Sequence, residues 1–238
     1  MHTRFATLFV AVALVLPTVS FAQDMRPTSP RVVVSGEGEV AVAPDMAIVS
    51  LSVMREAETA RAALDDANGA MSAVIAALKE AGIEPRDLQT SGLQINPRYV
   101  YPQDGTGEPR LTGYQVSNTL TIRVRDIATV GQVIDRSVTL GVNQGGSITF
   151  ANDDPSTART EARKRAVRDA ADKARTLAEA AGVELGAIIE MTEHASAEPP
   201  VTLGAKAMRM EAAPDAVPVE AGENTYRIQV NVTFELKQ

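Results

Sequence analysis

The sequence predicts an α+β protein made of two two-layer α/β sandwich subdomains, with mainly antiparallel sheets and helices packed on one face of each sheet. Two observations lead to this prediction. Segments in which apolar and polar residues alternate recur along the chain, as in half-buried strands, and between them lie segments whose apolar residues return at helical spacing. The chain is also long enough to build two small hydrophobic cores.

The first predicted strand lies in residues 32–45, with the sequence VVVSGEGEVAVAPD. Its core-facing side carries Gly36 and Gly38 in step with four valines. A dinucleotide-binding loop is excluded, because the third glycine of that fingerprint would fall at Ala41 and another strand follows in place of a helix. Glycine in a strand marks a bulge or the close approach of another backbone, so we expect these glycines to let an alanine-faced helix, the one that follows Thr59, pack closely.

The next strand is expected to form a hairpin with the first, because Pro44 and Asp45 supply a turn between them. Thr59 is the predicted N-cap of a helix that ends at Gly82. Alternation, caps and turn residues place the other elements before residue 151 as follows: strands at 46–54, 88–101, 114–124 and 147–150, a polar loop at 102–109, and a helix from Asp126 to Gly141.

The longest predicted helix begins after Asp154 with Pro155 in its first turn and ends at Gly182. Alanine recurs on it at every fourth position: Ala158, Ala162, Ala166, Ala170, Ala174 and Ala178. Its basic cluster of Arg163, Lys164, Arg165 and Arg168 lies among acidic residues at helical spacing, which indicates a solvated helix face. An interface with an acidic neighbour is the alternative.

The last part of the chain holds two strands and a long loop between them. A strand is predicted at 183–193, and the segment that follows is rich in alanine, proline and glutamate, with Met208 and Met210 in the middle. A loop of this length is either an unpacked excursion or a contact segment. The final strand, from Tyr226 to Leu236, alternates cleanly and is expected to join the first sheet.

The N-terminal residues predict export. Residues 1–22 combine Arg4, an apolar run from Phe5 to Leu16 and a small-residue cleavage pattern ending at Ala22, which is typical of a secretory signal peptide. The apolar run is shorter than the roughly 20 residues that a spanning helix needs, so we expect no transmembrane segment in the mature chain. With no cysteine anywhere, the exported protein has no disulfide to stabilise it.

The mature chain of 216 residues has 22 lysines and arginines against 30 acidic residues, a net charge of −8. Nucleic acid is therefore excluded as a partner, since binding it depends on neutralising phosphates. His194 is the one histidine left after cleavage, which argues against histidine-based metal sites and triads. The acid pairs Asp65–Asp66 and Asp153–Asp154 are assigned to a helix surface and to capping. No catalytic, cofactor-binding or metal-ligating residue is assigned, and no enzyme activity is expected.

The predicted organisation has five parts. They are a signal peptide at 1–22, an N-terminal linker at 23–30, a first α+β subdomain at 31–109 with 222–238, a second α+β subdomain at 110–194, and a Pro/Ala-rich loop at 195–221.

Several segments together resemble the SIMPL-domain family of bacterial envelope proteins, which includes the periplasmic immunogenic proteins. They are SGEGEVAVAPDMA from Ser35, RLTGYQVSNTLTIRVRD from Arg110, GVNQGGSITF from Gly141, DPSTARTEARKRAVRDAADKARTLAEAAGV from Asp154 and VPVEAGE from Val217. The resemblance implies a periplasmic or outer-membrane-associated protein of two α/β layers that forms ring-like or channel-like homo-oligomers and is linked with stress tolerance. The family supplies no agreed catalytic residues, so it implies none for this chain.

These observations predict an oligomeric structural or stress-related component of the envelope, without cofactor, that associates with itself or with another envelope protein. One alternative is an enzyme or small-ligand binding protein with a cleft between the two subdomains, walled by Tyr99, Tyr101, Tyr114 and the Met208 loop. Another is a protein-interaction module that acts through residues 195–221.

Overall fold

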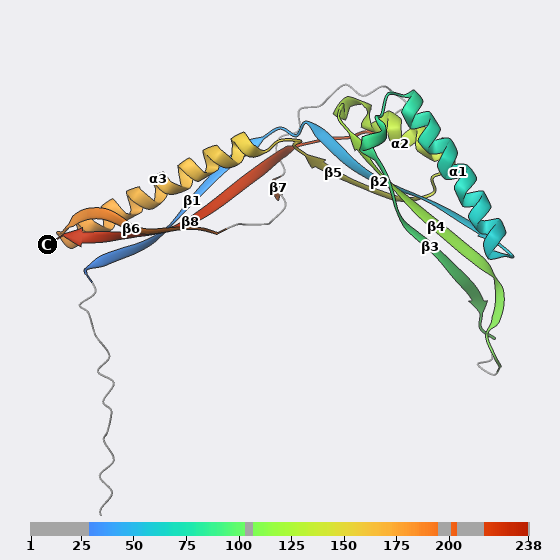
Figure 1. The fold of residues 1–238 in the computed structure, drawn as a ribbon, viewed down its shortest axis with the longest axis horizontal. Coiled ribbons are helices and arrows are strands. Elements are labelled where there is room, and N and C mark those ends of the chain that lie inside the picture. Colours follow the sequence, from blue (N-terminus) through green and yellow to red (C-terminus); the bar gives the residue numbers. More distant parts are fainter. Residues whose placement is uncertain (1–28, 103–106, 195–200, 204–216, 238) are drawn as a thin grey trace, which may run out of the picture.

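The computed structural model describes residues 29–102, 107–194, 201–203 and 217–237. Figure 1 shows two antiparallel sheets joined end to end at an angle, each with its helices on one face, so the α+β class expected from the sequence is confirmed. Most of the predicted signal peptide, linker and Pro/Ala-rich loop lies outside the described residues. Within that predicted loop, residues 201–203 form a short strand.

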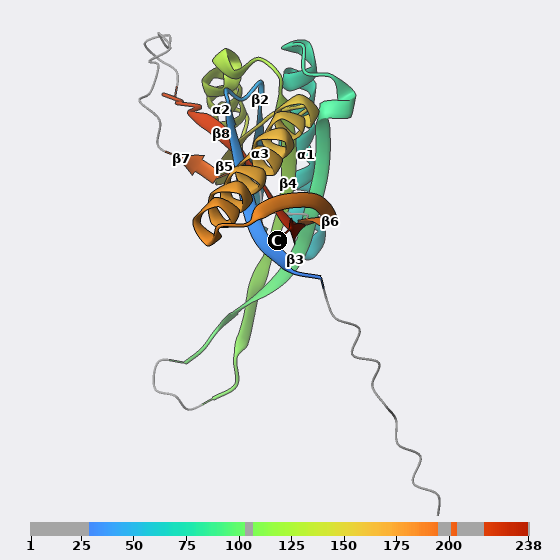
Figure 2. The ribbon, with the colours of Figure 1, turned by 90° about the vertical axis from the view of Figure 1, so that its left-hand side faces the viewer.

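The first sheet, here called the α3 sheet, has the strand order β1-β8-β6, and β7 also pairs with β8. One helix, α3, covers one of its faces (Figures 1 and 2). The elements are β1 (Arg31–Val42), α3 (Ser156–Ala181), β6 (Glu184–His194), β7 (Val201–Leu203) and β8 (Glu223–Lys237).

The second sheet, here called the α1 sheet, has the strand order β3-β4-β2-β5 and is covered on one face by α1 and α2. Its elements are β2 (Met46–Ala57), α1 (Ala60–Glu80), β3 (Leu88–Val100), β4 (Arg110–Val124), α2 (Val130–Thr139) and β5 (Gln144–Ala151). Two short 3₁₀ helices, η1 (Pro85–Asp87) and η2 (Ile127–Thr129), precede β3 and α2.

The strands are shared between the sheets differently from the sequence-based expectation. The expected β1–β2 hairpin is wrong: β1 pairs with β8, while β2 pairs with β4 and β5. The grouping into 31–109 with 222–238 and 110–194 is wrong for the strands as well, since β4 and β5 join β2, and α3 and β6 join β1. Alternation shows which face of a strand is buried but not which strand lies beside it.

The close contact between α3 and β1 explains why β1 has glycine at positions 36 and 38 and why α3 has alanine at every fourth position. A Cβ atom at Gly36 would lie 2.1 Å from the carbonyl oxygen of Ala166, and one at Gly38 would lie 2.1 Å from that of Ala162. The six alanines of the four-residue repeat are all buried. Backbone therefore rests on backbone, and the prediction that the two glycines make room for an alanine-faced helix is confirmed (Figure 2). The helix is α3, so the expectation that the helix after Thr59 lies there is wrong.

Charged side chains of α3 also cover the outer edge of β1, which is the end strand of its sheet. The Glu37 amide donates to Asp169 at 2.8 Å, and Lys173 donates to the Ser35 carbonyl at 3.0 Å. The hydrogen bonds from Lys173 and from the Glu37 amide hold the pKa of Asp169 below its usual range. Sheet edges with unpaired backbone groups recruit other strands, so these bonds protect β1 from such pairing.

The basic cluster on α3 is largely used within the chain. Arg165 donates to the Glu39 carbonyl at 2.7 Å, which extends the cover over the β1 edge. Arg163 pairs with Glu193 of β6 at 2.8 Å. Lys164 lies 3.8 Å from Glu161 on the exposed side of the helix.

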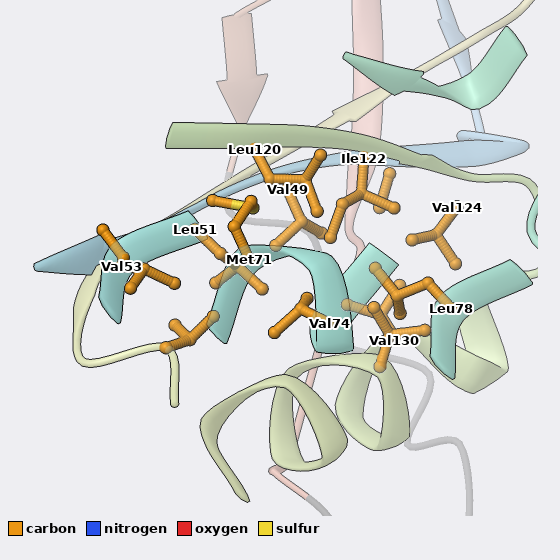
Figure 3. Packing of buried hydrophobic residues seen from close by; sticks show 14 of the residues in the cluster. Val49, Leu51, Val53, Met71, Val74, Leu78, Leu120, Ile122, Val124 and Val130 are labelled. Atoms are coloured by element: carbon orange, nitrogen blue, oxygen red, sulfur yellow. The ribbon is translucent and has the colours of Figure 1, made fainter. Parts of the chain in front are cut away.

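The core of the α1 sheet is made of larger side chains (Figure 3). Thr59 caps α1 as predicted, with its Oγ1 accepting from the Ala62 amide at 3.2 Å. The fully buried side chains come from β2, α1, β4 and the start of α2, and they include Val49, Leu51, Val53, Val74, Leu78, Leu120, Ile122, Val124 and Val130.

Two Gly→Ala substitutions test the α3–β1 contact. Gly36→Ala places a methyl group against the α3 backbone and is expected to lower the free energy of unfolding by about 3 kcal/mol or more. Gly69→Ala, in the middle of α1 with nothing within 4 Å of the added Cβ, is expected to raise it by about 1 kcal/mol. Urea unfolding of both variants measures this. Equal changes in the free energy of unfolding for the two variants would contradict a close contact between α3 and β1.

Candidate functional surfaces

A polar junction holds the two sheets together. It joins the β1–β2 connection, the segment after β5 and the start of β8. The Asn152 side chain donates to the Ala43 carbonyl at 2.8 Å, and its Oδ1 accepts from Asn224 at 3.0 Å and from the Tyr226 hydroxyl at 2.9 Å. Asn152 thus links all three segments through one amide group.

The junction is buried on its β8 side. Asn224 is fully buried and also donates to the Phe150 carbonyl at 3.3 Å, while its Oδ1 has no hydrogen-bond partner among the described residues. Burial raises the pKa of Tyr226, and the guanidinium of Arg159 lies 5.9 Å from the centre of its ring. These contacts orient Tyr226 and join the two sheets, so we assign the junction a structural role.

An ion-paired triad lies close to this junction. Arg125, directly after β4, donates to both oxygens of Asp87 at 2.9 and 3.0 Å and to Asp153 at 2.9 Å. Asp87 is only 4% exposed. The hydrogen bonds from Arg125 hold the pKa of Asp87 below its usual range, against the opposing effect of burial. Since the amide of Asp153 also donates to Asp45 at 2.8 Å, the triad ties η1 and β4 to the connection between the sheets.

The acidic residues considered from the sequence do not gather into a chemical site. Asp65 pairs with Arg61 on the exposed side of α1, and Asp154 accepts from the Ser156 amide at the start of α3. Among the described residues, no group of three or more His, Cys, Asp or Glu side chains is placed to hold a metal ion.

A group of exposed apolar residues lies on a projecting hairpin, here called the β3–β4 arm (residues 93–101 and 110–113). Figures 1 and 2 show the arm extending beyond the end of α1. The last pair between β2 and β4 is Ala57 with Tyr114, so beyond it the arm has two strands only. Its exposed large apolar residues are Leu93, Ile95, Tyr99, Val100, Tyr101 and Leu111.

One side of the arm continues the hydrophobic core without a cover. Ile95 pairs with the fully buried Val116, and Tyr99 pairs with Leu111 further out, so their side chains share the face that α1 covers elsewhere. Ile95, Tyr99 and Leu111 are 44%, 50% and 44% exposed. Tyr99 and Leu111 lie where the hairpin has two strands only. An apolar strip that continues onto a two-stranded hairpin, which is only marginally stable alone, is typical of a contact surface.

The tyrosines expected to wall a cleft between subdomains lie elsewhere. Tyr99 and Tyr101 are exposed at the outer end of the arm, which Figure 1 places at the far end of the α1 sheet from the α3 sheet. Tyr114 is half-buried at the base of the arm, and Met208 lies outside the described residues. The structure therefore does not bring these tyrosines to the junction.

Sequence reasoning missed the arm and the triad. The apolar residues of the arm alternate with polar ones as in any half-buried strand, so the sequence predicts a covered face. Their side chains are exposed because α1 does not extend over the arm. Asp87 and Arg125 are 38 positions apart, and no pattern in the sequence connects them.

These features define a two-sheet α+β protein in which an alanine-faced helix rests on a glycine-containing strand and a hairpin arm projects from the second sheet. Residues 32–234 match the model of the SIMPL family, described as "Protein of unknown function (DUF541)". The chain belongs to this family.

Two of the relatives described here match nearly the whole chain, and a third matches about 70% of it. The "26 kDa periplasmic immunogenic protein" of Brucella melitensis biotype 1 is 50% identical over 238 residues, covering 98% of this chain and 95% of the relative. The "Uncharacterized protein YggE" of Escherichia coli K12 is 27% identical over 240 residues, covering 98% and 94%. YggE of Edwardsiella ictaluri is 30% identical over 170 residues, covering 71% and 70%.

Asp87→Asn tests the triad. The depressed pKa of Asp87 means that its pairing stabilises the fold above the pKa of an unfolded aspartate, about 3.9, and that this contribution is lost as the pH falls through the lower folded-state value. The variant is expected to be less stable than the native chain by about 1–3 kcal/mol at pH 7. This difference should shrink as the pH falls below about 4.

Urea unfolding at a series of pH values measures the difference, with Asp66→Asn on the exposed side of α1 as the matched control. A gap between Asp87→Asn and the native chain that stays constant down to the lowest pH would contradict the assignment.

Proposed function

We propose that this protein is an exported, non-enzymatic structural component of the bacterial envelope that works in the periplasm as a homo-oligomer. The observation that supports assembly most directly is the uncovered apolar strip of Ile95, Tyr99 and Leu111 on the β3–β4 arm. Location is supported by the signal-peptide pattern in residues 1–22 and by the name of the Brucella relative, which is called periplasmic. In the described part of the chain, no helix is long and apolar enough to cross a membrane.

The arm is a better contact surface than the outer edge of β1. Three α3 side chains already bond to the edge backbone groups of residues 35, 37 and 39, so a second chain would have to displace them. The arm needs no such rearrangement, because its apolar face is open and continues a packed core. Burying that face in a neighbouring copy would stabilise the two-stranded hairpin and the assembly together.

The stress-related role and the outer-membrane association that the family resemblance implies belong to the same proposal. A structural component would contribute to stress tolerance through its assembly and its location, without catalysing a reaction. No group of described residues offers a nucleophile beside an oriented base, which is the arrangement that covalent catalysis needs.

The assembly proposal is tested by sedimentation velocity of the chain from residue 23 onward. The native chain is expected to sediment as an oligomer at micromolar concentration. The double variant Tyr99→Ser/Leu111→Ser removes apolar area from the arm and is expected to weaken association at least about tenfold.

Val138→Ser is the matched control, because Val138 is an exposed apolar residue on α2, away from the arm. It should leave the sedimentation profile unchanged. A native chain that stays monomeric at high concentration, or an arm variant that assembles like the native chain, would refute the proposal.

A further inference from the structure

The two sheets of this protein have separate hydrophobic cores. Among the described residues, the buried cluster between α3 and its sheet shares no member with the buried cluster between α1 and its sheet. No strand of one sheet pairs with a strand of the other in the described part of the chain. Each sheet with its helices is therefore a body of its own. Two such bodies in one chain turn relative to one another by default, unless a large apolar contact holds them together.

The described chain crosses between these two bodies at three places. The crossings are residues 43–45 between β1 and β2, residues 152–155 between β5 and α3, and residues 220–222 before β8. The third is a crossing because Val219 still packs against the core of the α1 sheet. Each crossing contains a proline or a glycine: Pro44, Pro155 and Gly222, the last with a φ of 62°. A hinge consists of a few such residues between elements, which absorb the change in backbone angles.

The side-chain bonds that join the two bodies are polar and converge on one residue. Three described side-chain hydrogen bonds join β8 to the end of β5 and the residue after it. Two of them, from Asn224 at 3.0 Å and from the Tyr226 hydroxyl at 2.9 Å, end on Oδ1 of Asn152. The third, from Asn224 to the Phe150 carbonyl, is longer at 3.3 Å. Asn152 also donates to the Ala43 carbonyl, in the first crossing, at 2.8 Å.

Each body holds its own side of this contact in place. The residue after Asn152, Asp153, pairs at 2.9 Å with Arg125, which follows β4 in the α1 sheet. On the other side, the guanidinium of Arg159 in α3 lies over the ring of Tyr226. The bodies therefore meet where Asn152 bonds to β8. Because hydrogen bonds are directional, the two bonds to Asn152 fix the angle between the bodies, which an apolar contact of the same size would do less strictly.

We propose that the three crossings form a hinge between the two sheets, and that Asn152 is the side chain that holds the hinge at the angle seen in Figure 1. The β3–β4 arm lies at the far end of the α1 sheet from this hinge, so a rotation there displaces the arm farther than it displaces the residues near the junction. The hinge thereby sets the direction in which the arm points relative to the α3 sheet. This proposal goes beyond self-association and does not rest on it, because a single chain contains the whole hinge.

Distances between two spin labels test the hinge. The chain has no cysteine, so two introduced cysteines are the only labelling sites. Ala76→Cys on α1 and Thr160→Cys on α3 place one label at an exposed position of each body. Double electron–electron resonance on the labelled chain, diluted with an excess of unlabelled chain, gives the distribution of label distances within one molecule.

The test variant is Asn152→Ala, and the matched control is Asn143→Ala. Asn143 lies directly before β5 as Asn152 lies directly after it. Both described side-chain bonds of Asn143 go to the backbone of Met54, at 2.8 and 3.0 Å, and so stay within the α1 sheet. Circular dichroism and thermal unfolding of every labelled variant check that it is folded.

The labelled native sequence and Asn143→Ala are expected to give one narrow distance peak, and Asn152→Ala is expected to give a shifted and broader one. Tyr226→Phe removes one of the two bonds to Asn152 and keeps the ring, so its peak is expected to have an intermediate width. It also serves as the test variant if Asn152→Ala does not fold.

Three outcomes would overturn the proposal. The first is a native distance distribution that is already broad, and the second is a native distribution that Asn152→Ala and Tyr226→Phe leave unchanged. The third is equal broadening by Asn143→Ala, which would mean that the α1 sheet itself loosens. A second label pair within the α3 sheet and its helix, Thr160→Cys with Glu190→Cys, is expected to stay unchanged in every variant, and broadening there would likewise count against a hinge.

Discussion

The backbone of α3 rests on the backbone of β1 at Gly36 and Gly38, and much of the architecture depends on this contact. Alanine side chains bury little apolar area, so a helix with an alanine face gains less from the hydrophobic effect than one with leucines. It compensates by approaching closely, since dispersion attraction falls off steeply with distance. A strand with valines at positions 36 and 38 would hold α3 away from the sheet. The glycines of β1 and the alanine repeat of α3 therefore depend on each other, although they lie in distant parts of the chain.

The same contact influences which surfaces remain open. Because α3 lies so close to β1, the side chains of Asp169, Lys173 and Arg165 reach the outer edge of that strand and bond to its backbone. One end of the α3 sheet is thereby closed to further strands. The apolar strip of the β3–β4 arm lies at the other end of the molecule and stays uncovered.

Local features of the fold were predictable from the sequence, and most of the partners of its elements were not. The exception is the last strand, which joins the sheet of the first strand as expected. The predictable features include Thr59 as the N-cap of α1 and Gly182, in the left-handed conformation, as the end of α3. The alternation of apolar residues in β8 likewise indicates which of its faces is buried. The packing of α3 on β1 depends instead on which helix fits the glycine face, a match between residues more than 120 positions apart. The triad was missed because its residues are also far apart in the sequence. The arm has the same alternation as a covered strand, so its exposure could not be predicted. Long-range complementarity carries no local pattern.

Amide hydrogen exchange at Glu37 tests the central contact most directly. On an unprotected outer strand this amide would face water and exchange rapidly, whereas its bond to Asp169 at 2.8 Å requires α3 to lie against β1. The account predicts that Glu37 exchanges as slowly as the neighbouring amides that bond to β8, and that Asp169→Ala accelerates exchange at Glu37 while leaving those neighbours protected. Rapid exchange at Glu37 in the native chain would show that α3 does not cover the β1 edge, and would contradict the account.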